Sequence, residues 1–318
     1  MHSPNRRLLL QTLALGGAMG LAGCVSAPPP LRVGSIVFPG YEPLFLARDL
    51  GWLHSDQVRL IELLSSQDSL RALASKQLEA AMLTLDEVLS GISEGLDLRV
   101  VAILDRSEGA DAVVVHPRVP NDAALAGLTL AYEEGAVGAL MLAEFLRAHK
   151  LKPEHFKRVP TTLMESAAAL RSGSADVVVT GEPWLSQLEA FGARRLFDSR
   201  AIPWRIIDLL AVRADVLTSH GHHIRHAVHS HYSALGFWQR RPEEAARRVA
   251  PRLDLPVEQV ATVLRGLIQP DLDTTRRWFQ PGSELARQVE ALQQQMVRDG
   301  LLSRSVPTGT LFDPRFLD

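Results

Sequence analysis

The stretch Leu31–Trp52, LRVGSIVFPGYEPLFLARDLGW, predicts a buried strand that runs directly into a helix. Its first seven residues, 31–37, are mostly apolar, and Pro39-Gly40 interrupts the run. Pro43 suits the first turn of a helix, and Gly51 is placed to end that helix in the left-handed conformation. Such a junction presents free backbone N–H groups to a small solute, so we expect it to border a binding site.

The chain begins with a segment typical of export. Arg6-Arg7 precedes an apolar run, and residues 1–23 are too short and glycine-rich for a membrane span. The ending Leu-Ala-Gly-Cys looks like a bacterial lipobox, which predicts cleavage before Cys24 and lipidation of its sulfur. An ordinary signal peptide with a chance cysteine is the alternative, and both Sec and twin-arginine export remain open. Residues 24–30, rich in proline, then form a tether.

The composition predicts a soluble, well-packed body behind this leader. Of the 318 residues, 46% are hydrophobic, and the formal net charge is −2. The near-neutral balance contains no basic block, which argues against a nucleic-acid partner. Cys24 is the only cysteine, so no disulfide can form within the chain.

Apolar segments alternate with helical patterns along most of the chain. Turn-forming residues bound the predicted strands at 58–63, 79–83, 99–104, 112–115, 128–131, 177–180 and 206–212, and a further strand ends at Val159. The β-α order predicts parallel-rich sheets covered on both faces, with ligands beyond the strand carboxyl ends. Beyond Asp215 we expect only helices.

The β-α unit recurs, which predicts two lobes. The passage from Leu73 to Thr84 resembles the one from Leu170 to Thr180, and each threonine is followed two residues later by an acid. Chance recurrence of a common pattern is the alternative. We assign residues 31–115 and 207–318 to the first lobe and 116–206 to the second. Two crossings between the lobes would make a hinged clamshell able to close on a ligand.

These motifs together resemble the solute-binding proteins of bacterial ABC importers. The resemblance rests on Pro39-Gly40-Tyr41-Glu42-Pro43-Leu44, Leu78-Glu79-Ala80-Ala81 with Thr84, Gly135-Ala136-Val137-Gly138, and Glu182-Pro183-Trp184. The nitrate, sulfonate and taurine type is the most similar branch, and it is similar in turn to the pyrimidine-precursor-binding proteins linked to thiamine. Gly181 departs from the pattern, which favours a bulkier residue there, and this would loosen the pocket.

The resemblance implies a type II periplasmic-binding-protein fold with a C-terminal helical segment and a ligand in the cleft. It implies a monomeric, exported lipoprotein, periplasmic or at the cell surface, that delivers a solute to an ABC permease and ATPase. It implies no cofactor, no bound metal and no catalysis. It also implies that backbone N–H groups of residues 135–137 contact the ligand. A sensory lipoprotein and, less favoured, a pyrimidine-precursor enzyme of the same fold are the alternatives.

The turns expected to face the cleft supply the candidate ligand-binding residues. They are Pro39, Tyr41, Ser66, Gln67, Thr84, Asp86, Asp105, Ser107, Gly135, Ala136, Val137, Glu182 and Trp204. These turns and their flanks carry seven acids, Glu42, Asp86, Asp105, Glu108, Glu134, Glu165 and Glu182, against one basic residue, Arg106. This imbalance favours a neutral or cationic organic solute, stacked on Tyr41, Tyr132 or Trp204. The alternative for Glu42, Glu87 and Glu165 is that they face water at helix starts.

A histidine-rich run, His220–His231, is the remaining notable feature. His222 and His226 are spaced to share one helix face, which would suit a metal ion, whereas a solvated helix face is the simpler interpretation. No Gly-x-Ser-x-Gly, P-loop or His-Glu-x-x-His motif occurs in the sequence, so an enzyme is disfavoured.

Overall fold

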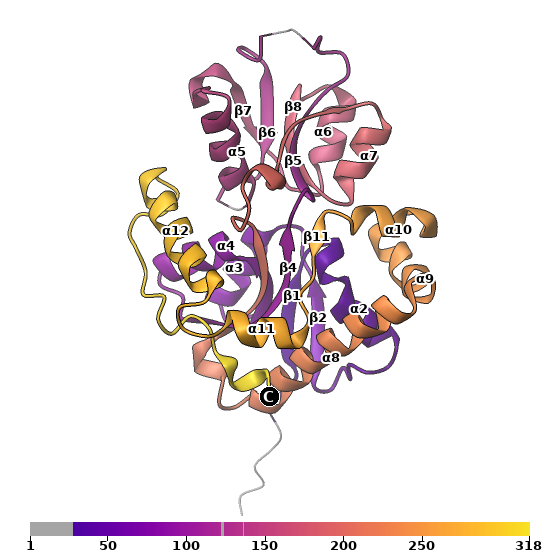
Figure 1. The fold of residues 1–318 in the computed structure, drawn as a ribbon, viewed down its shortest axis with the longest axis vertical. Helices are drawn as coiled ribbons and strands as arrows, with labels where there is room; N and C mark the ends of the chain where they lie inside the picture. Colours follow the sequence, from indigo (N-terminus) through magenta and orange to yellow (C-terminus); the bar gives the residue numbers. More distant parts are fainter. Residues whose placement is uncertain (1–27, 122–123, 136) are drawn as a thin grey trace, which may run out of the picture.

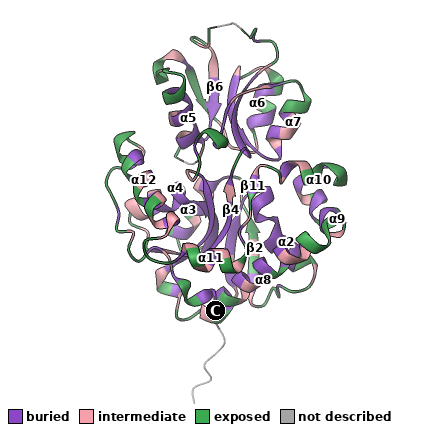
Figure 2. Cartoon of the chain, viewed as in Figure 1, coloured by how far each residue is buried: buried purple, intermediate pink, exposed green. Residues whose placement is uncertain are grey.

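The computed structural model describes residues 28–121, 124–135 and 137–318. Figure 1 shows two α/β lobes, one above the other. The first lobe is built on a six-stranded sheet and the second on a five-stranded sheet. Figure 2 shows that the strands of both sheets are largely buried, whereas the outer faces of the helices are exposed. The predicted two-lobed α/β architecture is therefore confirmed.

The sheet of the first lobe is mixed. Strand β1 pairs in parallel with β2 and β3, whereas β10 lies antiparallel between β3 and β4. In spatial order the strands are β11 (Leu267–Ile268), β4 (Leu98–Ser107), β10 (Ile207–Arg213), β3 (Ala80–Thr84), β1 (Leu31–Ser35) and β2 (Val58–Glu62). The sheet is parallel only near the N-terminal strands, because β10 enters from the second lobe in the opposite direction.

The sheet of the second lobe repeats this arrangement. Strand β8 pairs in parallel with β6 and antiparallel with β5, as β3 does with β1 and β10. The spatial order is β7 (Lys157–Pro160), β6 (Thr129–Tyr132), β8 (Val177–Gly181), β5 (Asp111–Val115) and β9 (Arg194–Asp198). The two similar passages that end at Thr84 and Thr180 thus contain β3 and β8, which have equivalent neighbours in their sheets.

Helices cover both faces of each sheet (Figure 1). In the first lobe, α3 (Ser66–Ala74), α4 (Leu85–Ser93) and α12 (Glu284–Arg298) lie on one side of the sheet. The other side carries α2 (Glu42–Asp49), α8 (Gly221–Arg240), α9 (Pro242–Leu253) and α10 (Val257–Val263), and α11 (Leu272–Trp278) lies near α8. In the second lobe, α5 (Val137–Ala148) lies opposite α6 (Ser166–Ser172) and α7 (Trp184–Ala190).

The strand-to-helix stretch folds nearly as its sequence predicts. After β1, the 3-10 turn η1 (Pro39–Tyr41) leads into α2, with Pro43 in the first turn of the helix. Gly51 follows the helix with φ +76°, and its N–H donates to Arg48 O at 2.9 Å. A glycine adopts this left-handed conformation without the steric cost of a Cβ.

Two segments connect the lobes, and they contact each other. The Ser107 and Ser199 hydroxyls lie 2.8 Å apart, and Gly109 N–H donates to Ser199 Oγ at 2.6 Å. The first crossing falls between β4 and β5, because β5 pairs with β8 and β9. Residues 111–115 therefore belong to the sheet of the second lobe, and our boundary after residue 115 is too late. The apolar run of β5 predicts a strand but not the sheet that it joins.

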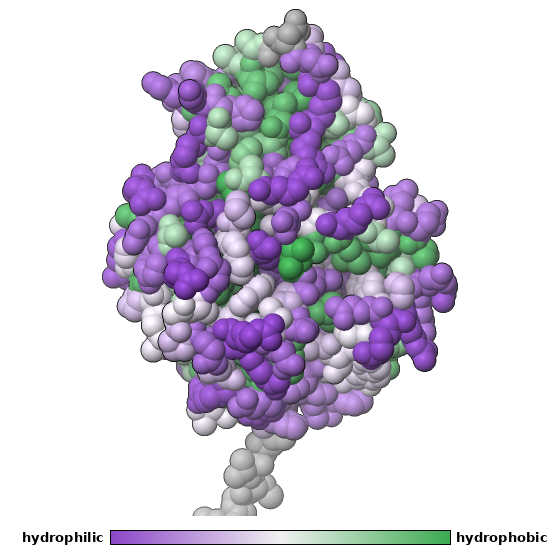
Figure 3. Space-filling model, in the orientation of Figure 1, coloured by the Kyte–Doolittle hydropathy of each residue, from purple (hydrophilic) through white to green (hydrophobic). Residues whose placement is uncertain are grey.

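The C-terminal part is helical except for one short strand. Strand β11 pairs with the end of β4, which corrects the expectation of helices alone beyond Asp215. A strand of two residues is too short to show the alternation that predicts strands. None of the helices in the described part of the chain has the length and hydrophobicity needed to cross a membrane. In Figure 3 the visible surface is mainly hydrophilic, with an apolar strip on the side of α9 and α10.

Candidate ligand-binding site

Three polar residues form a row across the first sheet, at the edge that faces the second lobe. Antiparallel pairing places Asp208 of β10 opposite both Thr84 of β3 and Asp105 of β4. Directly opposed residues on neighbouring strands point to the same face of the sheet. All three are buried, with exposures of 5% for Thr84, 0% for Asp105 and 1% for Asp208.

The turn after β1 closes over this row. The Tyr41 hydroxyl donates to Asp208 Oδ1 at 2.6 Å. Gly40 lies against Asp105 so closely that a Cβ on residue 40 would lie 1.7 Å from Asp105 Oδ2. The Pro39-Gly40-Tyr41 turn thus leaves room for one carboxyl group and donates a hydrogen bond to its neighbour.

This contact gives a prediction for Gly40→Ala. The added methyl group forces Asp105 or the turn to move, so we expect a loss of about 1–3 kcal/mol in unfolding free energy. Urea unfolding of the variant measures it. Gly221→Ala is the control, because its Cβ would meet nothing closer than Phe316 at 3.9 Å. Equal stability of the two variants would contradict the close packing of Asp105 on Gly40.

The second lobe adds two acids. Asp111 begins β5 and lies opposite Gly181 of β8. A Cβ on Gly181 would lie 2.9 Å from Asp111 Oδ1, so this carboxyl group fills the space that we expected to loosen the pocket. Glu133 follows β6 and accepts a hydrogen bond from Leu163 N–H at 3.2 Å. Both acids are buried.

Two small cavities lie where the lobes meet. One, of about 20 Å³, is lined by both lobes, including Tyr41, Thr84, Glu87, Asp111 and Asp208. The other, of about 10 Å³, lies in the second lobe beside Asp111, Glu133 and Thr180. A water molecule needs about 10–15 Å³ of such space, so each cavity has room for little more than one water molecule.

Burial raises the pKa of each acid around the cleft. The pKa of Asp105 rises to about 8, as does that of Asp86, where the charge of neighbouring Glu87 adds to the effect of burial. Burial also raises the pKa of Glu133 to about 7 and that of Asp111 to about 6. Burial and then the charge of Asp105 raise the pKa of Asp208 well above its usual range. A charge taken from water into a cavity without a counter-charge is costly, so these groups favour their neutral forms.

The structure places nine of the thirteen predicted ligand-binding residues at or beside the interlobe cavity. Tyr41, Ser66, Thr84 and Val137 line the interlobe cavity. Pro39 and Asp105 lie beside it in the Gly40 contact, and Asp86 is buried next to Glu87 at the start of α4. Gln67 Nε2 donates across the cleft to the carbonyl oxygen of Gly135. Ala136 and Cys24 lie outside the described residues.

Three predicted site residues have other contacts instead. Ser107 bonds Ser199 at the crossing, and Glu182 accepts from Ser186 N–H and Oγ at 3.1 and 2.8 Å within the second lobe. Trp204 packs on Trp278 and lies under the Arg106 guanidinium, 4.6 Å from its ring centre. Position at a strand end does not determine which way such a side chain points, so the sequence does not separate these three from the residues that line the cavity.

Several lining residues were missed. They are Ile36, Phe38, Glu87, Asp111, Glu133, Gly138, Met141, Leu163, Val179, Thr180, Ile206 and Asp208. Asp208 had a readable signal, since it is the single acid in the apolar run of residues 206–212. Glu87 was expected to face water, but it is 1% exposed and accepts from Thr84 N–H at 2.9 Å, as the Glu of a capping box does.

Not all acids of the cleft turns reach the cleft. Glu42 is fully buried against Arg252 within the first lobe, which corrects the interpretation that it faces water. Glu108, Glu134 and Glu165 are exposed. Arg106, the one basic residue of these turns, pairs with Glu108 at 3.2 Å. Among the described residues that line the two cavities there is no Arg, Lys or His.

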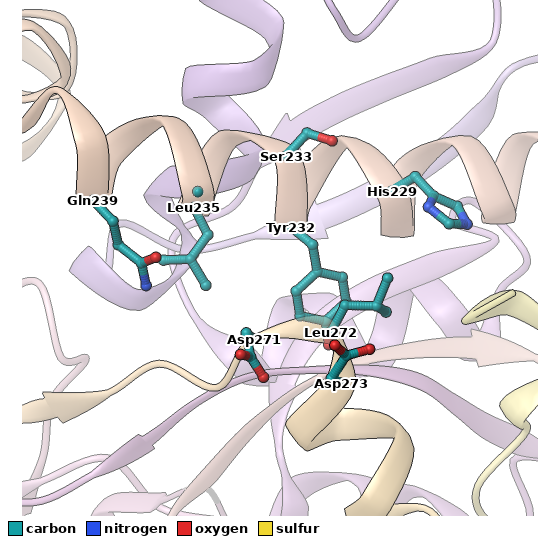
Figure 4. Close-up of a pocket in the computed structure, with 9 residues that line it drawn as sticks. His229, Tyr232, Ser233, Leu235, Gln239, Asp271, Leu272 and Asp273 are labelled. Atoms are coloured by element: carbon teal, nitrogen blue, oxygen red, sulfur yellow. The ribbon is translucent and has the colours of Figure 1, made fainter.

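A larger hollow, of about 340 Å³, lies on the surface between α8 and α11 (Figure 4). Several of its polar groups already have partners. The Tyr232 hydroxyl bonds Thr275 Oγ1 at 2.8 Å, Asp271 accepts from Thr274 N–H at 2.7 Å, and Asp273 pairs with Arg276 at 2.9 Å. This hollow therefore has few groups free to recognise a ligand.

The histidine-rich run forms the first half of α8. His226 stacks on His54 with ring centres 6.0 Å apart, and His231 is fully buried. Within the described residues, no three His, Cys, Asp or Glu side chains are arranged to hold a metal ion.

Comparison with known protein families shows which family the chain belongs to. The sequence model of the NMT1-like family matches residues 26–253, which is more than two thirds of the chain. The protein belongs to the NMT1-like family. No curated protein matches the sequence.

Solved structures with the same fold include solute-binding components of ABC importers. The alkanesulfonate-binding protein SsuA from Xanthomonas axonopodis, bound to MOPS, has a TM-score of 0.76 at 18% identity, covering 91% of this chain and 99% of that one. A zinc-bound ligand-binding component of an ABC-type import system from Staphylococcus aureus has a TM-score of 0.74 at 15% identity, with coverages of 91% and 98%. The desulfurization enzyme DszB has a TM-score of 0.64 at 18% identity, with coverages of 90% and 97%. The NMT1-like protein thus has the predicted periplasmic-binding-protein fold.

Proposed function

We propose that this NMT1-like protein is an extracytoplasmic solute-binding protein that captures a small organic solute between its lobes and delivers it to an ABC importer. The observation that carries the proposal is the interlobe cavity. Polar side chains from both lobes line it, and several of them, including Asp208 Oδ2 and Glu87 Oε1, have no hydrogen-bond partner in the protein. Buried polar groups are normally paired, so unpaired polar atoms in a cleft support a role in binding a ligand.

A thermal-shift screen of the full chain in mild detergent tests solute capture. The panel contains sulfonates, nitrate, pyrimidines, polyamines and small amines. A solute that binds the folded form alone raises the melting temperature with dose. A dose-dependent shift that Thr84→Val weakens supports capture in the cleft, whereas binding that is insensitive to this change contradicts it. Uptake of the same solute by vesicles carrying the permease separates transport from sensing, and turnover of the solute would indicate an enzyme instead.

The proposal includes export and a lipid anchor at Cys24, and the mature, membrane-attached protein acts as a monomer. Mass spectrometry of the membrane fraction from expressing bacteria tests it. The expected N-terminal peptide begins at Cys24 and carries a diacylglycerol. Cys24→Ala should retain its leader, and an unlipidated mature N-terminus would contradict the anchor.

Lobe closure involves a contact on one flank of the cleft. Glu144 and Arg147 of α5, in the second lobe, meet Gln295 and Asp299 of α12, in the first. Gln295 donates to Glu144, and Arg147 pairs with Asp299 and, at 2.7 Å, with Glu144. These contacts join the lobes only when the lobes are close, so they stabilise the closed form.

Removing this contact should favour the open form. For Arg147→Ala we expect ligand affinity to fall about 2- to 5-fold, because Arg147 is half-exposed and its ion pairs contribute about 1 kcal/mol or less. Small-angle X-ray scattering of the ligand-free variant should show a larger radius of gyration. Arg287→Ala is the control, since Arg287 pairs with Glu284 of the same helix. Unchanged scattering and affinity in Arg147→Ala would contradict a role in closure.

A further inference from the structure

Six acids surround the cleft without a counter-charge. They come from both lobes and are each at most 8% exposed: Asp86, Glu87, Asp105, Asp111, Glu133 and Asp208. The groups that face them are themselves acidic or neutral, including Tyr41, Ser66 and Thr84. Glu182, a buried acid that the sequence also predicts at the cleft, instead accepts a hydrogen bond from the Ser186 hydroxyl. Full ionisation of the six would place several negative charges within one water-poor space.

The hydrogen-bonding capacity of the cleft is also one-sided. Both carboxyl oxygens of Asp105 lack a donor, as do Glu87 Oε1, Asp111 Oδ2, Glu133 Oε1 and Asp208 Oδ2. Once these groups are ionised they only accept hydrogen bonds, so a ligand that binds the ionised cluster must supply donors rather than acceptors. A nitrate or sulfonate group supplies only acceptors and a like charge, so this cleft disfavours it.

Two glycines make room for these carboxyl groups. Gly40 admits Asp105, and Gly181 admits Asp111, each where a methyl group would collide with a carboxyl oxygen. The acids are thus accommodated by the backbone on both sides of the cleft. Since no described trio of side chains suits a metal ion, nitrogen-based cations are the ligand class that meets both the charge and the donor requirement.

Resting on the proposed function, we propose that the solute is an organic cation with several N–H donors, of the amine, amidine or guanidine class, and that it enters in exchange for protons held by the acid cluster. In the ligand-free closed form the buried carboxyl groups of Asp86, Asp105 and Asp208 keep protons because no other positive charge is present. The cation forms N–H···O bonds to the carboxylates, and the displaced protons pass to solvent water. No covalent bond to carbon forms or breaks.

Calorimetry of the full chain in mild detergent tests this exchange. The probes are agmatine, benzamidine and spermidine, with ethanesulfonate, nitrate and uracil for comparison. At pH 7.5, titrations in phosphate and in bicine give different apparent enthalpies when protons are released, since the two buffers take up protons with different heats. We expect at least one cation to bind with release of about one proton, and its affinity to rise up to about tenfold per pH unit between pH 6 and 8.

Matched variants identify the acids involved. Asp111→Asn keeps the shape of the side chain and should weaken cation binding at least tenfold with little change in proton release, because burial raises the pKa of Asp111 only to about 6. Asp105→Asn should reduce proton release, because the pKa of Asp105 is about 8. Glu243→Gln, on the exposed surface of α9, should leave both unchanged. Saturable binding of an anion or a neutral solute in the cleft, without proton release, would overturn the cationic class and leave the solute-binding function standing. Failure of all three cations to bind would overturn the cationic class, whereas the thermal-shift screen tests the solute-binding function separately.

Discussion

Replacing Arg252 by alanine is expected to destabilise the protein by about 3–5 kcal/mol, because it leaves a buried acid without its partner. Arg252 lies in the last turn of α9 and pairs with Glu42 at the start of α2, which is fully buried. The same guanidinium bonds Glu62 at 2.9 Å and Ile36 O at 3.0 Å, and it lies 3.5 Å from the ring centre of Phe45. One side chain thus joins α9 to the strand-to-helix stretch that begins the fold.

The loss should grow with pH. Burial raises the pKa of Glu42 from 4.5 to about 7, although Arg252 lowers it in part. Without Arg252 the folded state holds this proton more tightly, whereas the unfolded chain loses it above about pH 4.5. Stability that depends on a raised carboxyl pKa falls as the pH rises. Urea unfolding at pH 5 and pH 8 should therefore show the larger difference from wild type at pH 8.

A neighbour on the same helix provides the control. Arg248 is exposed and pairs with Glu244 at 3.4 Å, so Arg248→Ala should change stability by about 0.5 kcal/mol or less. The double change Glu42→Gln with Arg252→Met should recover part of the loss, since it removes the uncompensated charge. An Arg252→Ala protein as stable as Arg248→Ala at both pH values would contradict the buried pair.

Most helices and strands of this fold are predictable from local sequence patterns. The Pro39-Gly40 break, the capping pair Thr84 and Glu87, and the closing Gly51 each act over four residues or fewer, so spacing alone predicts them. Of the eleven strands in the described residues, nine were predicted for the same reason, with ends that differ from the structure by at most three residues, whereas β9 and β11 were missed. What periodicity does not encode is which strands pair, and so β5 was assigned to the wrong lobe.

The site was predicted only in part because its key contacts join distant positions. Asp105 and Asp208 are opposed only because β10 returns antiparallel to β4, and Glu42 meets Arg252 across 210 residues. Acidic character alone therefore wrongly assigns Glu108 and Glu134 to the cleft, although both are exposed. It also leaves out Glu87, which is buried there. Two clues were available, the lone acid in the apolar segment of residues 206–212 and the glycine at 181.

Neutralising Asp105 is expected to stabilise the ligand-free protein strongly at pH 8. Asp105→Asn keeps the shape of the side chain, removes a group whose pKa burial raises to about 8, and offers an N–H donor to Asp208 on the neighbouring strand. The pKa of Asp105 rises from 3.8 to about 8, and each pKa unit corresponds to 1.36 kcal/mol, so the gain in unfolding free energy at pH 8 is on the order of 5 kcal/mol. The residue would then be one whose charge reduces stability in favour of ligand binding.

The pH dependence of stability shows whether the Asp105 carboxyl group stabilises or destabilises the folded protein. Folded wild type keeps protons on Asp105, Asp86 and Glu133 that the unfolded chain has released, so its stability should fall as the pH rises from about 5 to 8. Asp198 acts oppositely, since hydrogen bonds from Arg200 and Arg195 lower its pKa to about 2 against the effect of burial, but that stability is lost only below about pH 4. Thermal unfolding from pH 5 to 8 should show a shallower slope for Asp105→Asn than for wild type, with the largest gap at pH 8. Glu243→Gln should follow wild type throughout. A wild type whose stability rises over this range, or an Asp105→Asn protein less stable than wild type at pH 8, would mean that the buried carboxyl groups are compensated and that the cleft does not hold protons in reserve for a cation.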